Sequence, residues 1–208
     1  MKRYKSKTER RYGQNLQIKG ERGLSAKAAF LRRPFAPGLA GKKGGFRRRV
    51  SEYGNQLAEK QKLRITYGLK EKQFRSIINK AVASTEQTDV VIMQLLERRL
   101  DNVIMRMGLA ESRAQARQIV VHCHILVNGK KNNVPSHLVR QDDIISIKKK
   151  FKDSGLMKEI QPKLASFNPP AWIAMDKQKL EGKIIKLPEG KDLEIAIDLP
   201  QVIEFYSR

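Results

Sequence analysis

A chain of 208 residues with 40% hydrophobic content can form one or two domains around a modest core. Its formal net charge of +22 favours a polyanionic partner over a merely soluble charged surface, because such a surplus destabilises a compact chain through self-repulsion. The single cysteine, Cys123, excludes an internal disulfide and fits a reducing compartment. No apolar run reaches the length of a membrane span and no signal peptide is expected, so we expect a cytoplasmic protein.

Residues 1–45 are predicted to form a basic arm rather than a domain. Glycines and prolines interrupt every candidate periodic run, and lysines and arginines fill the gaps. Such a segment cannot bury enough apolar surface to fold alone, but it can become ordered on an anionic surface. A phosphate-binding loop at Gly41-Lys42 is rejected, because neither Ser nor Thr follows it and no strand precedes it.

Residues 46–87 are predicted to form a small helical domain. Ser51 can cap a first helix that Gly68 ends, and a second helix with one apolar face begins at about Lys70. Neither helix carries enough apolar surface to be a domain alone. A terminal helix is predicted close to the end of the chain, and we expect residues 190–208 to return and complete this domain.

The stretch from Thr88 to Lys150 reads as helix, turn, helix, hairpin and strand. Gly108 is predicted to end the first helix, and Ser112 with Gln115 has the spacing of a capping box that begins the second. The first helix has one apolar stripe at the α-helical period, formed by Leu96, Leu100, Val103, Ile104 and Met107.

The second half of this stretch is predicted to be antiparallel sheet. Asn128-Gly129 between two extended runs favours a tight type I′ hairpin, and residues 144–147 read as a further strand. Residues 172–175 and 183–186 are plausible strands that extend the same sheet. We therefore predict an α+β fold in which residues 88–189 form one module with added strands.

No residue pattern in the sequence predicts a catalytic or metal site. His122, Cys123 and His124 are adjacent at a helix end and cannot all face one ion, and a Cys/His nucleophile pair lacks an orienting third group. Asp142 and Asp143 are typical of a turn rather than of an acid/base pair. We therefore expect no enzymatic activity, no cofactor and no bound metal.

Basic side chains are the basis for predicting RNA binding, because a guanidinium holds a phosphate with two parallel hydrogen bonds. Arg113 and Arg117, one turn apart, are predicted to join Arg99 and Arg106 of the neighbouring helix in one phosphate-binding face. The alternative is a solvated helical surface. The predicted RNA-binding residues are Arg47, Arg48, Arg49, Lys60, Lys62, Arg64, Lys72, Arg75, Arg99, Arg106, Arg113, Arg117 and Lys130.

Two helices joined at Gly108 also fit a DNA-binding helix-turn-helix. A recognition helix needs base-reading residues near its N-terminus, and residues 112–115 are only modestly suited to that task. The hairpin and the long basic arm fit the shape-reading of structured RNA better. A DNA-binding regulator therefore stays as an alternative.

Three motifs resemble the RNA-binding domain named after the fourth protein of the small ribosomal subunit. They are Leu96-Glu97-Arg98-Arg99-Leu100-Asp101-Asn102-Val103, Arg113-Ala114-Gln115-Ala116-Arg117-Gln118 and His124-Ile125-Leu126-Val127-Asn128-Gly129-Lys130. Residues 51–62 and 67–75 resemble the helical domain of that ribosomal family, and residues 203–208 resemble its ending. The chain is identified as a bacterial-type member, with the resemblance covering about residues 46–208.

The resemblance implies a structural protein that binds small-subunit rRNA early in subunit assembly. It also implies a place near the path of the mRNA into the subunit, beside the third and fifth small-subunit proteins, with an influence on decoding accuracy. The RNA-binding module would be inserted into the helical domain. Many members carry a cysteine-rich zinc knuckle near the N-terminus, but residues 1–50 contain no cysteine, so we expect no zinc.

The resemblance leaves one further alternative, because the same domain occurs in RNA-modifying enzymes. Such an enzyme needs a catalytic domain, and once residues 46–208 are assigned only the glycine-rich arm remains to supply it. The resemblance also places Cys123 where glycine is common in the family, which we interpret as a tolerated surface change.

Overall fold

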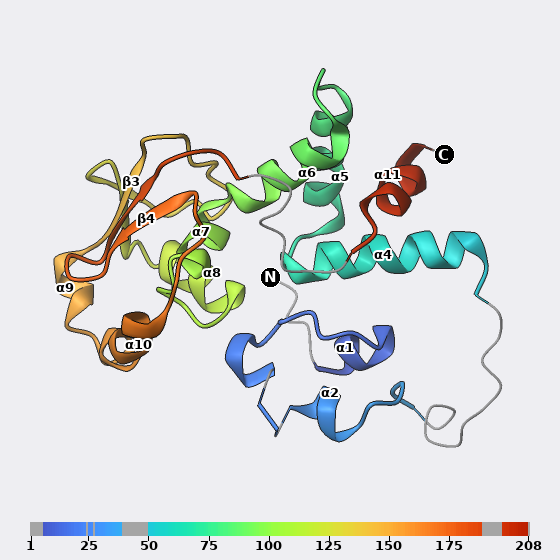
Figure 1. Ribbon diagram of the computed structural model, residues 1–208, viewed down its shortest axis with the longest axis horizontal. Helices are drawn as coiled ribbons and strands as arrows, with labels where there is room; N and C mark the ends of the chain where they lie inside the picture. The colour runs from blue at the N-terminus through green and yellow to red at the C-terminus, as the bar shows by residue number, and fades with distance from the viewer. Residues whose placement is uncertain (1–5, 24, 27, 39–49, 189–196, 208) are drawn as a thin grey trace. The chain divides into compact units, whose positions relative to one another are not determined.

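The computed structural model describes residues 6–23, 25, 26, 28–38, 50–188 and 197–207. The chain divides into two compact units, Met1–Ile92 with Leu193–Arg208, and Met93–Asp192. Helices and one antiparallel sheet make up the fold (Figure 1), which confirms the predicted α+β class. Within the described ranges no helix is long and apolar enough to cross a membrane.

The N-terminal part of the first unit contains short helices that composition did not reveal. They are α1 (Ser6–Tyr12), the 3-10 helix η1 (Gly20–Gly23) and α2 (Ala29–Arg32). Glu9 is buried, and its carboxylate accepts a hydrogen bond from the Ile18 backbone N–H. Arg10 lies over the ring of Phe35 and donates to the carbonyl of Arg33. These local contacts order a stretch that has little apolar sequence.

The first unit also contains three longer helices: α4 (Glu52–Thr66), α5 (Glu71–Val82) and α11 (Leu199–Ser207). The hydroxyl of Ser51 accepts from the Gly54 N–H and caps α4, as predicted, and Gly68 follows the helix with φ +62°. α11 packs on α4, where the ring of Phe205 meets that of Tyr53. The ring of Tyr206 meets the buried Phe74 of α5, so α11 covers apolar surface of both helices.

The second unit contains a five-stranded antiparallel sheet with the order β2-β1-β3-β5-β4. Its strands are β1 (Ile125–Val127), β2 (Lys130–Asn132), β3 (Ile144–Ile147), β4 (Ile173–Asp176) and β5 (Glu181–Ile184). Asn128 and Gly129 both have positive φ, 50° and 76°, which confirms the type I′ hairpin. The last strand in sequence, β5, begins and ends two residues before the predicted range.

Five helices complete the second unit: α6 (Thr88–Glu97), whose start belongs to the first unit, α7 (Leu100–Arg106), α8 (Arg113–Val121), α9 (Lys149–Lys152) and α10 (Gly155–Ser166). α7 packs against α8, and their apolar residues share one core with the inner face of the sheet and with Trp172.

Gly108 has φ +76°, and a Cβ there would lie 2.7 Å from the ring of Phe167. Cys123 also has positive φ, 59°, a conformation that glycine adopts without strain.

The apolar stripe predicted one continuous helix through residues 96–107, and this prediction is wrong. The backbone of Arg99 is extended, with φ −66° and ψ 135°, and it pairs with Leu138 in an isolated antiparallel bridge. The Leu100 N–H donates to the carbonyl of His137 at 2.8 Å instead of to the preceding helical turn. The stripe is nevertheless buried, because α7 resumes with its apolar side facing the same core.

Candidate nucleic-acid interface

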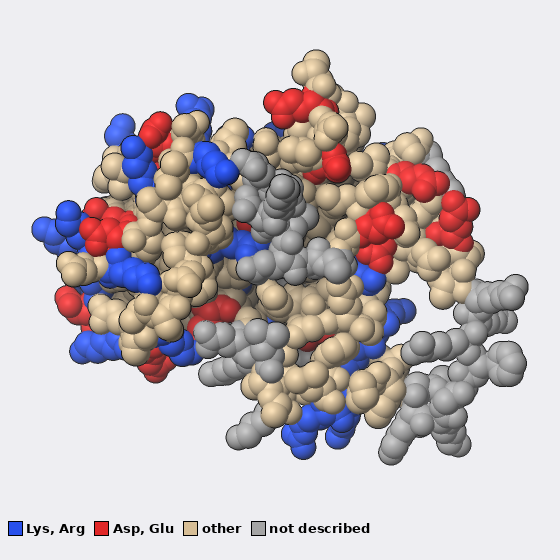
Figure 2. Space-filling model, in the orientation of Figure 1, with Lys and Arg blue, Asp and Glu red and all other residues tan. Residues whose placement is uncertain are grey.

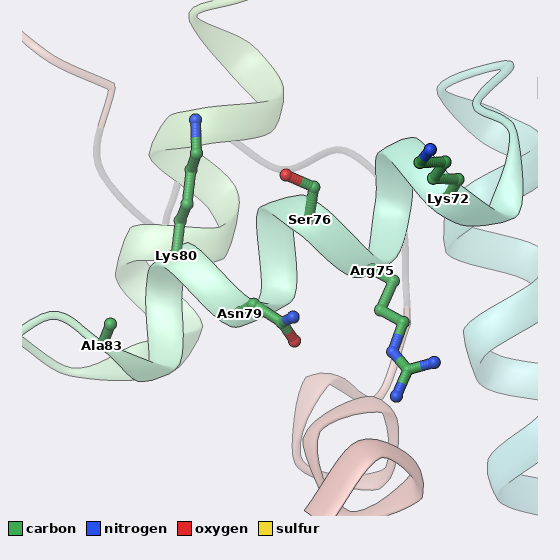
Figure 3. A pocket seen from close by; sticks show the side chains of 6 residues that line it. All are labelled: Lys72, Arg75, Ser76, Asn79, Lys80 and Ala83. Atoms are coloured by element: carbon green, nitrogen blue, oxygen red, sulfur yellow. The ribbon is translucent and has the colours of Figure 1, made fainter.

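The outer face of α5 carries basic side chains around an open hollow of about 420 Å³. The six lining residues lie at offsets 0, 3, 4, 7, 8 and 11, which is one helical face. They are Lys72, Arg75, Ser76, Asn79, Lys80 and Ala83 (Figure 3). Ser76, Asn79 and Ala83 are small or uncharged, so an extended anion can approach the backbone between the cations. We call this surface the α5 face.

The three cations of the α5 face are exposed, and none of them forms an ion pair with another described residue. Lys72 and Arg75 belong to the predicted RNA-binding set. Lys80 was outside that set, although its offset of eight residues from Lys72 could have included it. These side chains keep the full hydrogen-bonding capacity that phosphate contacts need.

Lys60, predicted as an exposed RNA contact, is instead buried, with only 5% of its surface exposed. Its ammonium donates to Glu71 at 2.8 Å and lies 4.4 Å from the centre of the Phe205 ring. A buried ammonium is stable only with such partners. Two neighbours are also engaged, since Lys62 pairs with Glu59 and Arg64 with Glu71. These three basic residues of α4 therefore pair with carboxylates of their own unit.

The pKa of Glu71 is lowered, since burial opposes ionisation but hydrogen bonds from Lys60 and Tyr206 and the charge of Arg64 outweigh it. Glu71 therefore contributes stability above its unfolded pKa of about 4.3, and this contribution is lost as the pH falls through the folded value. We expect Glu71→Gln to lower the urea midpoint, followed by far-UV circular dichroism, at neutral pH and much less near pH 3. The exposed Glu86→Gln is the control, and equal shifts at both pH values would contradict the assignment.

In the second unit, Glu97 lies at the centre of a buried polar cluster. Arg106 donates to its two carboxylate oxygens at 2.9 and 3.2 Å, and the Asn102 amide donates to it at 2.8 Å. The Arg113 Nε in turn donates to the side-chain Oδ1 of Asn102 at 2.8 Å. We call these four residues the Glu97 cluster. It joins the end of α6 to α7 and α8.

Asp101 forms a second cluster beside the first. Arg99 holds its carboxylate with two hydrogen bonds of 3.1 and 2.8 Å, and Arg117 of α8 donates to the same carboxylate at 3.1 Å. The side chains of Arg99 and Asp101 are 4% and 7% exposed, whereas 24% of the Arg117 side chain is exposed. We call these three residues the Asp101 cluster.

These clusters correct the predicted phosphate-binding face. Arg99, Arg106 and Arg113 are only 3%, 4% and 8% exposed, so they are not surface arginines. Helical spacing placed them away from the apolar stripe, but Asp101 holds Arg99, Glu97 holds Arg106, and the side-chain oxygen of Asn102 accepts from Arg113. Of the predicted RNA-binding residues of the second unit, Arg117 is partly exposed and Lys130 of β2 is exposed.

Other predicted contacts differ in their surroundings. Arg47, Arg48 and Arg49 lie outside the described residues. On the sheet-bearing unit, carboxylates are interspersed with lysines and arginines (Figure 2). Lys183, for example, pairs with Asp142 at 2.8 Å. The three cations of the α5 face, by contrast, form no ion pair with a carboxylate among the described residues and lie around one hollow.

Comparison with known protein families matches most of the first unit and part of the second. Residues 1–97 match the ribosomal protein S4/S9 N-terminal domain, and residues 98–145 match the S4 domain. The helical unit and the helix pair with its hairpin therefore define a ribosomal protein that carries an S4-type RNA-binding module.

Relatives of nearly equal length give the family. The small ribosomal subunit protein uS4 of Aquifex aeolicus is 44% identical over 205 residues, covering 97% of this chain and 95% of the relative. The uS4 proteins of Heliobacterium modesticaldum and Kosmotoga olearia are 45% and 43% identical over 199 residues, with 96% of this chain and 94% of each relative covered. The chain belongs to the uS4 family of small ribosomal subunit proteins, a structural rather than an enzymatic family.

Proposed function

We propose that this chain is a structural component of the small ribosomal subunit that binds small-subunit rRNA as a primary protein and nucleates subunit assembly in the cytoplasm. The resemblance extends the proposal to a place beside the third and fifth small-subunit proteins, close to the incoming mRNA, with an influence on translational accuracy. The proposal includes three segments: the arm at 1–45, the helical domain at 46–87 completed by 190–208, and the RNA-binding module at 88–189.

The α5 face is the observation that carries the proposal. Lys72, Arg75 and Lys80 project from one exposed helical face without ion-pair partners among the described residues. In a chain with a net charge of +22, unpaired cations along a hollow of small side chains favour a polyanion that can lie along the helix. Lys130 and the part of Arg117 that is exposed add positive charge on the second unit.

Titration of the purified chain with naked small-subunit rRNA tests the proposal. We expect log K to fall linearly with log salt, by roughly 0.9 for each duplex phosphate neutralised. Chemical footprinting of the same complex would give the protected rRNA helices. Duplex DNA of equal length should fail to displace the RNA at equal concentration. Ready displacement would favour a DNA-binding regulator, and absence of rRNA binding at moderate salt would contradict the proposal.

A further inference from the structure

The Asp101 cluster places one carboxylate between two guanidinium groups. Arg99 approaches it with two parallel hydrogen bonds, which is the strongest geometry for this pair, and Arg117 adds a third bond to Oδ2. With all three groups ionised, the cluster has a net charge of +1. The negative charge of Asp101 is thus compensated by the buried Arg99 before Arg117 contributes.

Arg117 is the member of this cluster that reaches the surface. The side chains of Arg99 and Asp101 are almost fully buried, whereas about a quarter of the Arg117 side chain is exposed. Its bond to Asp101 uses one N–H of Nη1, and a guanidinium has five such donors. Ala114 and Gln118, its exposed neighbours on α8, are uncharged. Among the described residues, Asp101 is the carboxylate that lies within ion-pair distance of Arg117.

A long side chain that is free in solution loses rotamer entropy when it binds a phosphate. The bond to Asp101 removes much of that freedom beforehand, and Asp101 is itself fixed by Arg99 and by its place in the first turn of α7. The remaining N–H groups of Arg117 are then presented in a fixed direction beside a positively charged cluster.

We propose that Asp101 is a positioning residue for RNA binding: it holds Arg117 ready to contact a phosphate of the rRNA backbone, while Arg99 cancels the repulsion that the carboxylate would exert. This inference rests on the proposed function, and it assigns an acidic residue to the binding of a polyanion.

Asp101→Asn gives the sharpest test, because charge alone and positioning predict opposite results. Removing a carboxylate from an RNA-binding protein strengthens binding electrostatically. If Asp101 positions Arg117, the variant instead binds naked small-subunit rRNA about five-fold more weakly. Arg117→Gln is expected to bind about ten-fold more weakly and to lower the slope of log K against log salt by roughly 0.9. Asp142→Asn, an exposed carboxylate of the same unit, is the charge-matched control and should not weaken binding.

The double variant separates positioning from damage to the fold. In an Arg117→Gln background, Asp101→Asn should cause no further decrease in affinity, whereas general damage would weaken both backgrounds equally. Undiminished binding by Asp101→Asn would overturn the inference. If that variant does not fold, Arg117→Lys decides, since it keeps the charge without the planar fork and wild-type affinity would overturn the inference. Failure of the unmodified chain to bind rRNA would instead contradict the proposed function itself.

Discussion

Glu97→Ala is expected to lower the free energy of unfolding of the second unit by about 3–5 kcal/mol. The carboxylate is 1% exposed and holds the buried Arg106 through two hydrogen bonds. Its removal takes from the buried Arg106 guanidinium the two hydrogen bonds to this carboxylate, and it removes an acceptor from Asn102, which in turn holds Arg113. Trp172, the single tryptophan, is fully buried in the same unit, so its fluorescence in urea reports this unfolding directly.

A paired substitution distinguishes loss of the ion pair from loss of packing. Glu97→Leu combined with Arg106→Met removes both charges and keeps apolar volume, so we expect it to be more stable than Glu97→Ala alone. Glu159→Ala on the exposed side of α10 is the control and should change stability by less than about 0.5 kcal/mol. A cost below about 1 kcal/mol for Glu97→Ala would mean that the cluster does not hold the unit together.

The parts of the fold that could be predicted are those with local causes. The cap at Ser51, the type I′ turn at Asn128-Gly129 and the helix end at Gly108 each depend on a few neighbouring residues. The break at Arg99 could not be predicted in this way, because its backbone partners belong to the loop around Leu138. An apolar stripe reports which residues are buried, not where the backbone hydrogen bonds go.

The same break explains why the arginine face was mispredicted. On a continuous helix, residues two positions apart do not face each other, so Arg99 and Asp101 would point in different directions. Because Arg99 is extended and precedes α7, its guanidinium can turn back onto the Asp101 carboxylate. Sequence spacing identified these arginines as important, but their burial depends on this tertiary geometry.

The α5 face was predictable for the complementary reason. α5 is a regular helix, so helical spacing alone places Lys72 and Arg75 away from its apolar face and on the surface. Glu71 lies four residues before Arg75, a spacing that favours an ion pair, but it pairs with Lys60 and Arg64 of α4 instead. The surface position of Lys72 and Arg75 therefore follows from the sequence, whereas their lack of a carboxylate partner among the described residues depends on the packing of α5 against α4.

The triple variant Lys72→Gln, Arg75→Gln and Lys80→Gln is expected to weaken binding to small-subunit rRNA roughly a hundred-fold at moderate salt. It should also lower the slope of log K against log salt by roughly 0.9 for each phosphate that the protein no longer neutralises. All three side chains are exposed and form no ion pair with a described residue, so the free energy of unfolding should change by less than about 1 kcal/mol. Filter binding across a salt series, with thermal melting of each variant, gives both quantities.

A charge-preserving variant of the same three positions provides the matched control. Lys72→Arg with Arg75→Lys and Lys80→Arg keeps the charge of the α5 face and should keep the salt slope, because counterion release depends on charge rather than on the shape of the cation. If the glutamine variant binds rRNA with an unchanged slope, the α5 face lies outside the interface. If the charge-preserving variant loses the slope as well, the effect arises from the geometry of α5 and not from its charge. The pair of variants therefore separates phosphate binding from local structure on one helical face.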